Sequence, residues 1–277
     1  TAMFTAIEAA KPGFLALRPT GESIAWFDST VLLTGLGFYC WPHTFGSLYT
    51  AKEERAFRRN AALLPLYQLI LLFVFFVGFA AILKVPGLTG GDIDLALFRL
   101  SLQHFDPWFI GVIGAAGVLT ALVPGSMILM SSATLLANNL YRAFRPDAED
   151  RTVTNLARGL VPVVALVAVW FTLSGGTTIV ALLLMGYAFV TQLFPCLVAS
   201  LLPHNPVTRE GAIAGICVGV ATVAATSLTH TSFATLFPTW PEGVRDLNIG
   251  IIALVLNLVA LTVVSAVTRR RAAVPAE

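Results

Sequence analysis

The stretch GLGFYCWPH combines the residue types that could hold a small solute inside an apolar chain. Its glycines and its proline are expected to unwind a helix, which exposes backbone groups and aromatic faces to a small ligand. The sequence therefore predicts a substrate-binding segment made of two glycines, which allow the unwinding, and three aromatic residues, which form the wall: Gly35, Gly37, Phe38, Tyr39 and Trp41. The alternative is an aromatic packing cluster beside a proline kink.

A second stretch, TALVPGSMILMSSATLLANNLYR at 120–142, carries hydroxyl groups on either side of a helix break expected at Pro124-Gly125. Proline removes a backbone donor, and inside lipid the freed carbonyl must face protein or a watery cavity. Thr120 and Ser126 are therefore candidates for coupling to an ion. Alternatively, this is a kinked packing helix whose hydroxyls bond back to their own turn.

His43 is the third ion-coupling candidate, because imidazole titrates close to neutral pH. Its alternative is a hydrogen-bonded structural residue. The other polar residues expected inside apolar segments are Gln192 and Asn257.

The composition indicates an all-α integral membrane protein. Hydrophobic residues make up 57% of the chain and charged residues 12%, whereas soluble domains are about 25% charged. No Asp, Glu, Lys or Arg falls in the middle of an expected span, and the three cysteines show no metal-binding or disulfide spacing. We expect no catalytic residues, no metal site, no enzyme activity, no nucleic-acid partner and no cofactor beyond a coupling ion, proton or sodium.

Apolar segments predict seven transmembrane helices after an extracytoplasmic loop at 1–26. The transmembrane portion is 27–268 and a cytoplasmic tail follows at 269–277. The expected spans are 27–50, 61–83, 107–143, 153–174, 177–202, 210–229 and 247–268. Within the sixth, Gly211, Gly215 and Gly219 form a ridge that lets another helix approach closely.

Basic residues predict the orientation. Twelve of the 17 Lys and Arg residues follow spans one, three, five and seven. The positive-inside rule places these loops and the C-terminus in the cytoplasm. The protein is then expected in a bacterial cytoplasmic (inner) membrane.

Three segments resemble the sodium:solute symporter family. The segment GFYCWPHTFGSLYTAKEERAFRRNAALLP is similar to the sixth core helix of the proline and pantothenate symporters, LYRAF to the end of the eighth, and VTREGAIAGICVGV to the eleventh. The resemblance covers roughly 27–270, and ALVPGSMILMSSATLLANNLYR and NIGIIALVLNLVALTVVS favour the bacterial monocarboxylate permease branch.

The resemblance implies a LeuT-type inverted-repeat fold in which the seven spans are core helices six to twelve. The chain would then be an incomplete, C-terminal portion whose partners are the lipid bilayer, a small-molecule substrate and the missing N-terminal helices of the same polypeptide. The implied function is secondary transport of a monocarboxylate such as lactate, pyruvate or a short-chain acid by alternating access. The alternatives are a symporter-like sensor domain of a signalling protein, or a sodium-coupled symporter for another solute such as an amino acid.

One departure from the family concerns sodium. Sodium-using members carry a hydroxyl pair about sixteen residues before the end of the eighth core helix. Counting back from Asn139 reaches Val123 and Pro124, which have no hydroxyl. We therefore expect the usual sodium site to be degraded, with Thr120 and Ser126 flanking the gap.

Overall fold

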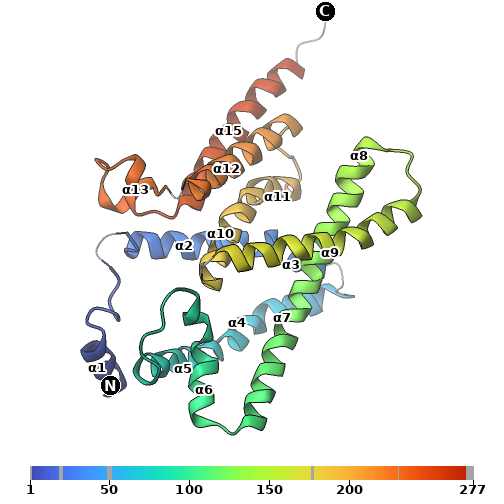
Figure 1. Ribbon diagram of the computed structural model, residues 1–277. Coiled ribbons are helices and arrows are strands. Elements are labelled where there is room, and N and C mark those ends of the chain that lie inside the picture. The colour runs from blue at the N-terminus through green and yellow to red at the C-terminus, as the bar shows by residue number, and fades with distance from the viewer. Residues whose placement is uncertain (1, 19–20, 49–51, 176–177, 230, 273–277) are drawn as a thin grey trace, which may run out of the picture. The chain divides into compact units, whose positions relative to one another are not determined.

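The computed structural model describes residues 2–18, 21–48, 52–175, 178–229 and 231–272 (Figure 1). Helices and turns account for all regular structure within these ranges. The chain divides into two compact units. Unit 1 comprises Thr1–Ala6 and Phe45–Ile179, and unit 2 comprises Ile7–Thr44 and Val180–Glu277.

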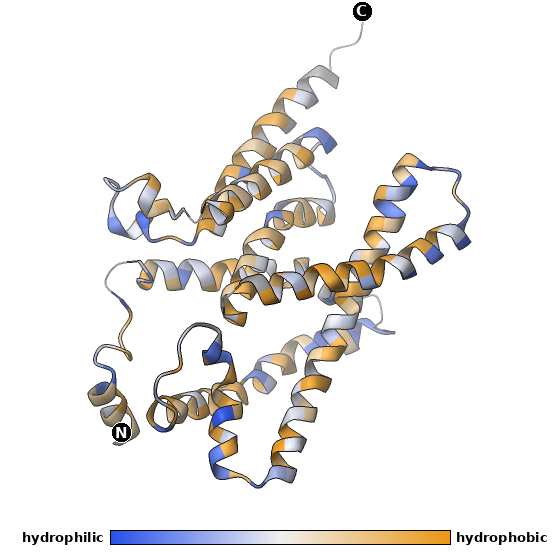
Figure 2. Cartoon of the chain, in the orientation of Figure 1, coloured by the Kyte–Doolittle hydropathy of each residue, from blue (hydrophilic) through white to orange (hydrophobic). Residues whose placement is uncertain are grey.

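Six helical segments of the described chain are long and apolar enough to cross a membrane. They are Glu54–Lys84, Pro107–Phe144, Asp150–Leu173, Ile179–Leu201, Arg209–Leu228 and Ile249–Arg269. The remaining predicted span, 27–50, is divided between α2 (Ile24–Gly37), a 3-10 turn η1 (Phe38–Cys40) and α3 (Pro42–Leu48). Figure 2 shows apolar residues along these helices and hydrophilic residues at many of the turns. The all-α membrane architecture expected from the composition is confirmed.

Unit 1 contains the second, third and fourth spans. Its elements are α4 (Glu54–Gln68), α5 (Leu71–Lys84), η2 (Gly90–Leu95), α6 (Ala96–His104), α7 (Pro107–Leu135), η3 (Leu136–Tyr141), α8 (Arg142–Phe144) and α9 (Asp150–Gly175). The second span begins earlier than predicted, so Arg55, Arg58 and Arg59 lie on α4 and not in a loop. Arg58 pairs with Glu54 one turn earlier at 2.5 Å, a spacing that favours helix.

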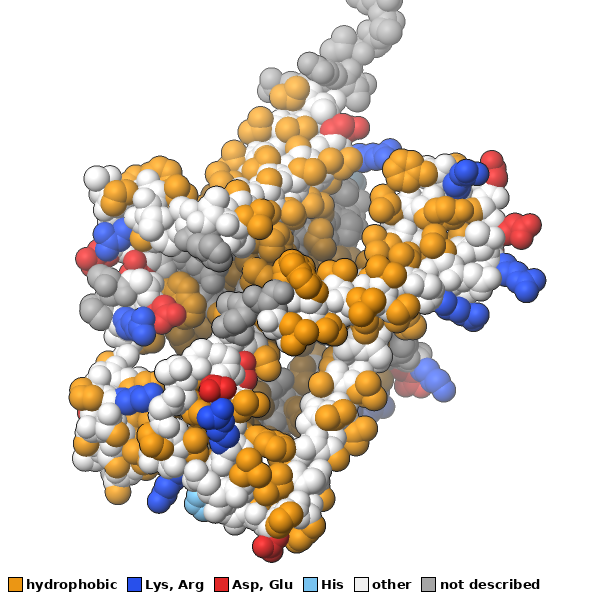
Figure 3. All heavy atoms as spheres, viewed as in Figure 1, with side chains coloured by type: hydrophobic (Ala, Val, Ile, Leu, Met, Phe, Trp, Pro, Cys, Tyr) orange, Lys and Arg blue, Asp and Glu red, His pale blue; other side chains and the backbone are white. Residues whose placement is uncertain are grey.

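In the third span, the helix break predicted at Pro124-Gly125 is wrong. α7 runs through Pro124 without interruption, and the irregularity lies further on, in the π-helical turn η3. α7 and η3 pack against α9, and small buried side chains such as Ala133 and Ala137 allow the contact. Arg142 closes the far end through an ion pair with Asp150. Figure 3 shows charged side chains gathered around the turn between α8 and α9, with hydrophobic side chains over the helices.

Unit 2 contains the first, fifth, sixth and seventh spans. Besides α2, η1 and the start of α3, its elements are α10 (Ile179–Val190), η4 (Thr191–Leu193), α11 (Phe194–Leu201), α12 (Arg209–Leu228), α13 (Phe233–Leu236), α14 (Glu242–Arg245) and α15 (Ile249–Ala272). α12 and α15 lie side by side along their lengths (Figure 1).

The glycine ridge of α12 makes this contact possible, as the sequence predicts. Gly211, Gly215 and Gly219 are all buried. A Cβ at Gly215 would lie 2.5 Å from Asn257 Oδ1 and 2.8 Å from Leu261 Cβ, while one at Gly211 would collide with Ser265 Oγ. The ridge therefore packs on α15 of this same chain, and at Gly219 also on Gln192 of η4.

Candidate solute site at an interrupted helix

The first span is interrupted where the sequence predicts. α2 ends at Gly37, and Trp41 adopts an extended conformation (φ −67°, ψ 130°) before α3 starts at Pro42. A residue before proline is driven out of the helical region by the proline ring, so Trp41-Pro42 itself encodes the break. The glycines do not unwind the helix, because Gly35 and Gly37 both lie within α2.

Gly37 instead permits close contact with the fifth span. A Cβ at Gly37 would collide with Thr191 Oγ1 and lie 3.1 Å from Tyr187 Cδ1. The Thr191 hydroxyl lies 2.7 Å from the Tyr187 carbonyl and 3.1 Å from the Leu33 carbonyl, and donates toward both. Thr191 begins η4, the 3-10 turn that separates α10 from α11. Two interrupted helices of unit 2 therefore meet at their interruptions.

An aromatic group forms beside this crossing. Trp41 meets Tyr187 edge to face at 5.5 Å between ring centroids, and it lies 5.8 Å from His43 in a tilted arrangement. The Trp41 ring also packs on Gly186, where a Cβ would lie 2.8 Å from Cη2. Phe38 and Tyr39 make an edge-to-face pair with each other at 5.2 Å and are 36% and 41% exposed. Of the three predicted wall residues, Trp41 has the most enclosed ring.

Two buried ring nitrogens at this site have no hydrogen-bond partner among the described residues. They are Trp41 Nε1 and His43 Nδ1. The Tyr187 phenol lies near the Trp41 indole, but the arrangement falls short of a hydrogen bond. The indole N–H can only donate, whereas His43 Nδ1 donates or accepts according to the tautomer. A buried polar group without a partner costs about 1–3 kcal/mol, so a ligand that pairs with one is favoured.

Gln192 and Asn257 stabilise the contact between the two interrupted helices through buried hydrogen bonds. Gln192 Nε2 donates to Ala188 O at 2.9 Å and to Gly250 O at 3.1 Å, and Asn257 Nδ2 donates to Gln192 O at 2.7 Å. Both side chains are fully buried. The two polar residues expected inside apolar spans thus bond to each other and hold η4 against α15.

The hydroxyl candidates Thr120 and Ser126 belong to unit 1, whereas Trp41 and His43 belong to unit 2. Thr120 Oγ1 donates to Ala116 O at 2.8 Å and Ser126 Oγ to Val123 O at 2.9 Å. Each hydroxyl therefore bonds back to its own helix, which is the alternative interpretation given above for this stretch, a packing helix without an ion site. Within the described ranges, no group of three His, Cys, Asp or Glu side chains could hold a metal ion.

Tyr187 and Thr191 are the site residues that sequence reasoning missed. The available signal is the string YAFVTQLFP, in which Thr-Gln precedes a proline inside an apolar run. This pattern predicts a second helix interruption, but only the fold brings it to the first.

Comparison with known proteins identifies a family and several relatives that this chain is similar to. The family model "Sodium:solute symporter family" matches residues 2–219. The chain is 60% identical over 268 residues to "Uncharacterized symporter YhjB" of Bacillus subtilis, covering 97% of this chain and 55% of that protein.

Two further relatives are more distant. "Monocarboxylate transport permease protein" of Rhizobium johnstonii is 27% identical, with 92% of this chain and 52% of that protein covered. "Osmoregulated proline transporter OpuE" of Bacillus subtilis is 28% identical, with 97% and 53% covered. The chain spans about half the length of these curated relatives. No solved structure matches it. Together with the membrane-spanning helices and their interruptions, the family match and the 60% identity show that the chain belongs to the sodium:solute symporter family.

Proposed function

We propose that the chain forms part of a secondary active transporter that carries a small monocarboxylate, such as lactate, pyruvate or a short-chain acid, by alternating access. The observation that carries the proposal is a pair of buried ring nitrogens beside an interrupted helix, Trp41 Nε1 and His43 Nδ1, which have no hydrogen-bond partner among the described residues. Interrupted helices are where transporters of this type place their substrates.

A carboxylate suits this site for a chemical reason. Its two oxygens only accept hydrogen bonds, and the Trp41 N–H only donates. Bonds from neutral donors to a charged oxygen are stronger than neutral pairs, so an anion can bind here without a buried Lys or Arg. The ring faces of Trp41 and Tyr187 supply an apolar wall for a short carbon chain. The printed name of the Rhizobium johnstonii relative supports the same substrate class.

An amino acid such as proline is the second candidate. It shares the carboxylate and adds a cationic amino group, which aromatic faces attract. The Trp41 and Tyr187 rings could provide such faces, and one relative is named a proline transporter. The two candidates differ in the amino group, so competition between substrates separates them.

For coupling, we propose that uptake uses a proton or the solute gradient and depends little on sodium. The support is the absence of side-chain hydroxyls at Val123 and Pro124, the positions where the family resemblance places them. Pro124 has no N–H to donate to the carbonyl of Thr120, so this carbonyl is free to bind a cation. A single carbonyl holds a cation more weakly than a carbonyl together with two side-chain hydroxyls. His43 is the proposed proton-linked residue.

We also propose that further helices of the same polypeptide complete the transporter in a bacterial inner membrane, with the C-terminus cytoplasmic. The support is twofold. In the most apolar stretches of the second, third and fourth spans, only 6%, 0% and 0% of the residues are buried. These stretches therefore require a covering of lipid or protein. Most of the basic residues also follow spans one, three, five and seven, whose ends lie on the same side of the expected membrane.

The test is uptake of radiolabelled pyruvate by the complete transporter in proteoliposomes, with unlabelled lactate or proline as competitor. Trp41→Phe keeps an aromatic ring, although a smaller one, but removes the N–H, and should raise the KM for pyruvate about tenfold to a hundredfold. Trp170→Phe, on α9, is the matched control and should leave the KM unchanged. Competition by lactate but not proline supports the monocarboxylate. Competition by proline alone would replace it with the amino acid, and an unchanged KM for Trp41→Phe would remove the proposed role of the indole.

A further inference from the structure

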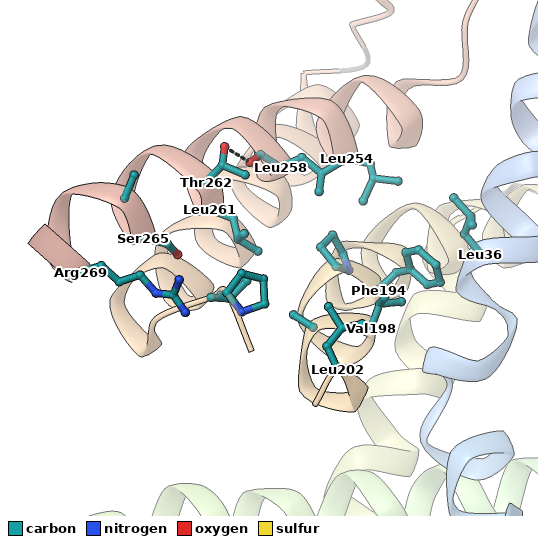
Figure 4. A pocket seen from close by; sticks show the side chains of 15 residues that line it. Leu36, Phe194, Val198, Leu202, Leu254, Leu258, Leu261, Thr262, Ser265 and Arg269 are labelled. Carbon is teal, nitrogen blue, oxygen red and sulfur yellow. Dashed lines mark hydrogen bonds between the residues drawn. The ribbon is translucent and has the colours of Figure 1, made fainter. Parts of the chain in front are cut away.

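Unit 2 has a cavity, which we call the α11–α15 groove, whose lining also includes Leu36 of α2. It has a volume of about 520 Å³ and lies between one face of α11 with the loop that follows it and one face of α15 (Figure 4). Phe194, Val198 and Leu202 line one side, and Leu254, Leu258 and Leu261 line the other. Val198, Leu202 and Leu258 remain 40%, 47% and 42% exposed, so the groove is open.

The groove changes character at one end. Its wall on α15 continues past Leu261 through Ser265 to Arg269. Among the described residues that line the groove, Arg269 is the single charged one. Arg269 donates to the Asn205 carbonyl through one nitrogen at 2.5 Å, and its guanidinium carries five N–H donors in all. An apolar channel that ends in a cation suits an amphiphile with an apolar tail and an anionic head.

The groove is long enough to hold a lipid tail across one leaflet. Leu254 and Arg269 are fifteen residues apart on a continuous helix, which is about 22 Å at 1.5 Å per residue. One leaflet of a bilayer has a hydrocarbon thickness of about 15 Å. A tail that starts at Arg269 would therefore reach the middle of the membrane near Leu258, within the groove. The sequence of the last turns of α15 contains three consecutive arginines, 269–271, and basic clusters at the end of a spanning helix attract anionic lipids.

We propose that the α11–α15 groove binds one acyl chain of an anionic phospholipid, whose phosphate is held at Arg269. A protein segment would gain from Arg269 only if it brought an acidic side chain there, whereas every anionic phospholipid carries its phosphate at the membrane surface. A zwitterionic phospholipid would fill the apolar part but gain less from the cation.

The test is photolabelling of the complete transporter in nanodiscs with a phosphatidylglycerol that carries a diazirine on its acyl chain. Adducts are mapped by peptide mass spectrometry, and unlabelled phosphatidylglycerol or phosphatidylcholine is added as competitor. We expect adducts on the peptides containing Phe194–Leu202 and Leu254–Arg269, with stronger competition by phosphatidylglycerol. Arg269→Gln should reduce that preference about fivefold, as expected for one basic residue at an anionic surface, and Arg269→Lys should restore it.

Matched variants separate the groove from general contact with lipid. Leu258→Trp should fill the groove and remove the adducts. Leu256→Trp is the control, since Leu256 has nearly the same exposed fraction (43% against 42%) but does not line the groove. Labelling that is equal over all membrane helices, or that is reduced equally by both Trp variants, would overturn the proposal. So would absence of labelling in the groove peptides, because a segment of protein then covers them.

Discussion

Asn257 on α15 donates from its side-chain amide to the backbone carbonyl of Gln192 at 2.7 Å, in the 3-10 turn η4. This bond joins the seventh span to the interruption of the fifth, next to the site where Thr191 meets Gly37. In a 3-10 turn a carbonyl accepts from the N–H three residues on, but the residue three after Gln192 is Pro195, which has no N–H, and Asn257 supplies a donor instead. The candidate solute site is thus tied to α15 through η4.

Replacing Asn257 tests this support. Asn257→Ala should lower the free energy of unfolding by about 1–2 kcal/mol, because the Gln192 carbonyl loses its donor in a fully buried place. The measurement is thermal unfolding of the complete transporter in mild detergent. Asn155→Ala, at an exposed position of α9, serves as control and should change stability little. Equal effects of the two variants would contradict the assigned role.

The glycine ridge gives a prediction with an internal control. Gly215→Ala places a methyl group 2.5 Å from Asn257 Oδ1, so overpacking should destabilise the protein by about 1–3 kcal/mol. Gly117→Ala lies within α7 with no atom within 4 Å of the new methyl group. It should be neutral or stabilising by up to about 1 kcal/mol, since alanine favours helix. If both variants behave alike in the same unfolding experiment, close approach of α12 and α15 does not depend on this glycine.

The three predicted wall residues should not contribute equally to uptake. Trp41→Ala should raise the KM for the solute most, because it removes an enclosed ring and a donor that has no other partner among the described residues. Phe38→Ala and Tyr39→Ala should have smaller effects, since those two rings pack on each other and are partly exposed. Phe171→Ala on α9 controls for loss of an exposed aromatic ring. Kinetics at matched expression decide the order, and parental behaviour of all three variants would reduce the cluster to packing.

Replacement of sodium by choline at fixed pH tests the coupling. The initial rate of uptake in proteoliposomes should change little, because Val123 and Pro124 offer no side-chain oxygen where the family pattern calls for two. A proton gradient imposed across the same vesicles should raise the rate if protons are coupled. Loss of uptake in choline would contradict the proposal and would assign the cation to Thr120 and Ser126.

The membrane spans and the first interruption could be predicted because both depend on local physics. Apolar length gives the spans, and Trp41-Pro42 gives the break through the steric effect of a ring on the residue before it. The ridge of three glycines also predicts close packing, since its spacing places them on one helix face. These features need no knowledge of distant neighbours.

The features that were missed or misplaced depend on contacts between distant segments, or on how a helix tolerates a proline. Nothing near Gly37 in the sequence reveals that Thr191 and Tyr187 lie against it. Pro124 was expected to break its helix, yet α7 continues, since loss of one hydrogen bond does not end a long helix that is otherwise intact. The partner of Gly211, Gly215 and Gly219 likewise becomes known only when α15 is seen beside them.

The π-helical turn η3 has a consequence for comparing this helix with those of relatives. A single π turn accommodates one extra residue in an otherwise α-helical segment, so it is the structural form of a one-residue insertion. If η3 is such an insertion, counting back from Asn139 should start one position earlier and reach Leu122 and Val123. Neither carries a hydroxyl, so the hydroxyl pair of the family is missing at these positions with or without the extra residue. The insertion also rotates everything before it by about 100° relative to Asn139. The spacing of residues that share a helix face is therefore one residue longer across η3 than within a regular α-helix. An alignment that assumes α-helical periodicity would assign such residues to different faces.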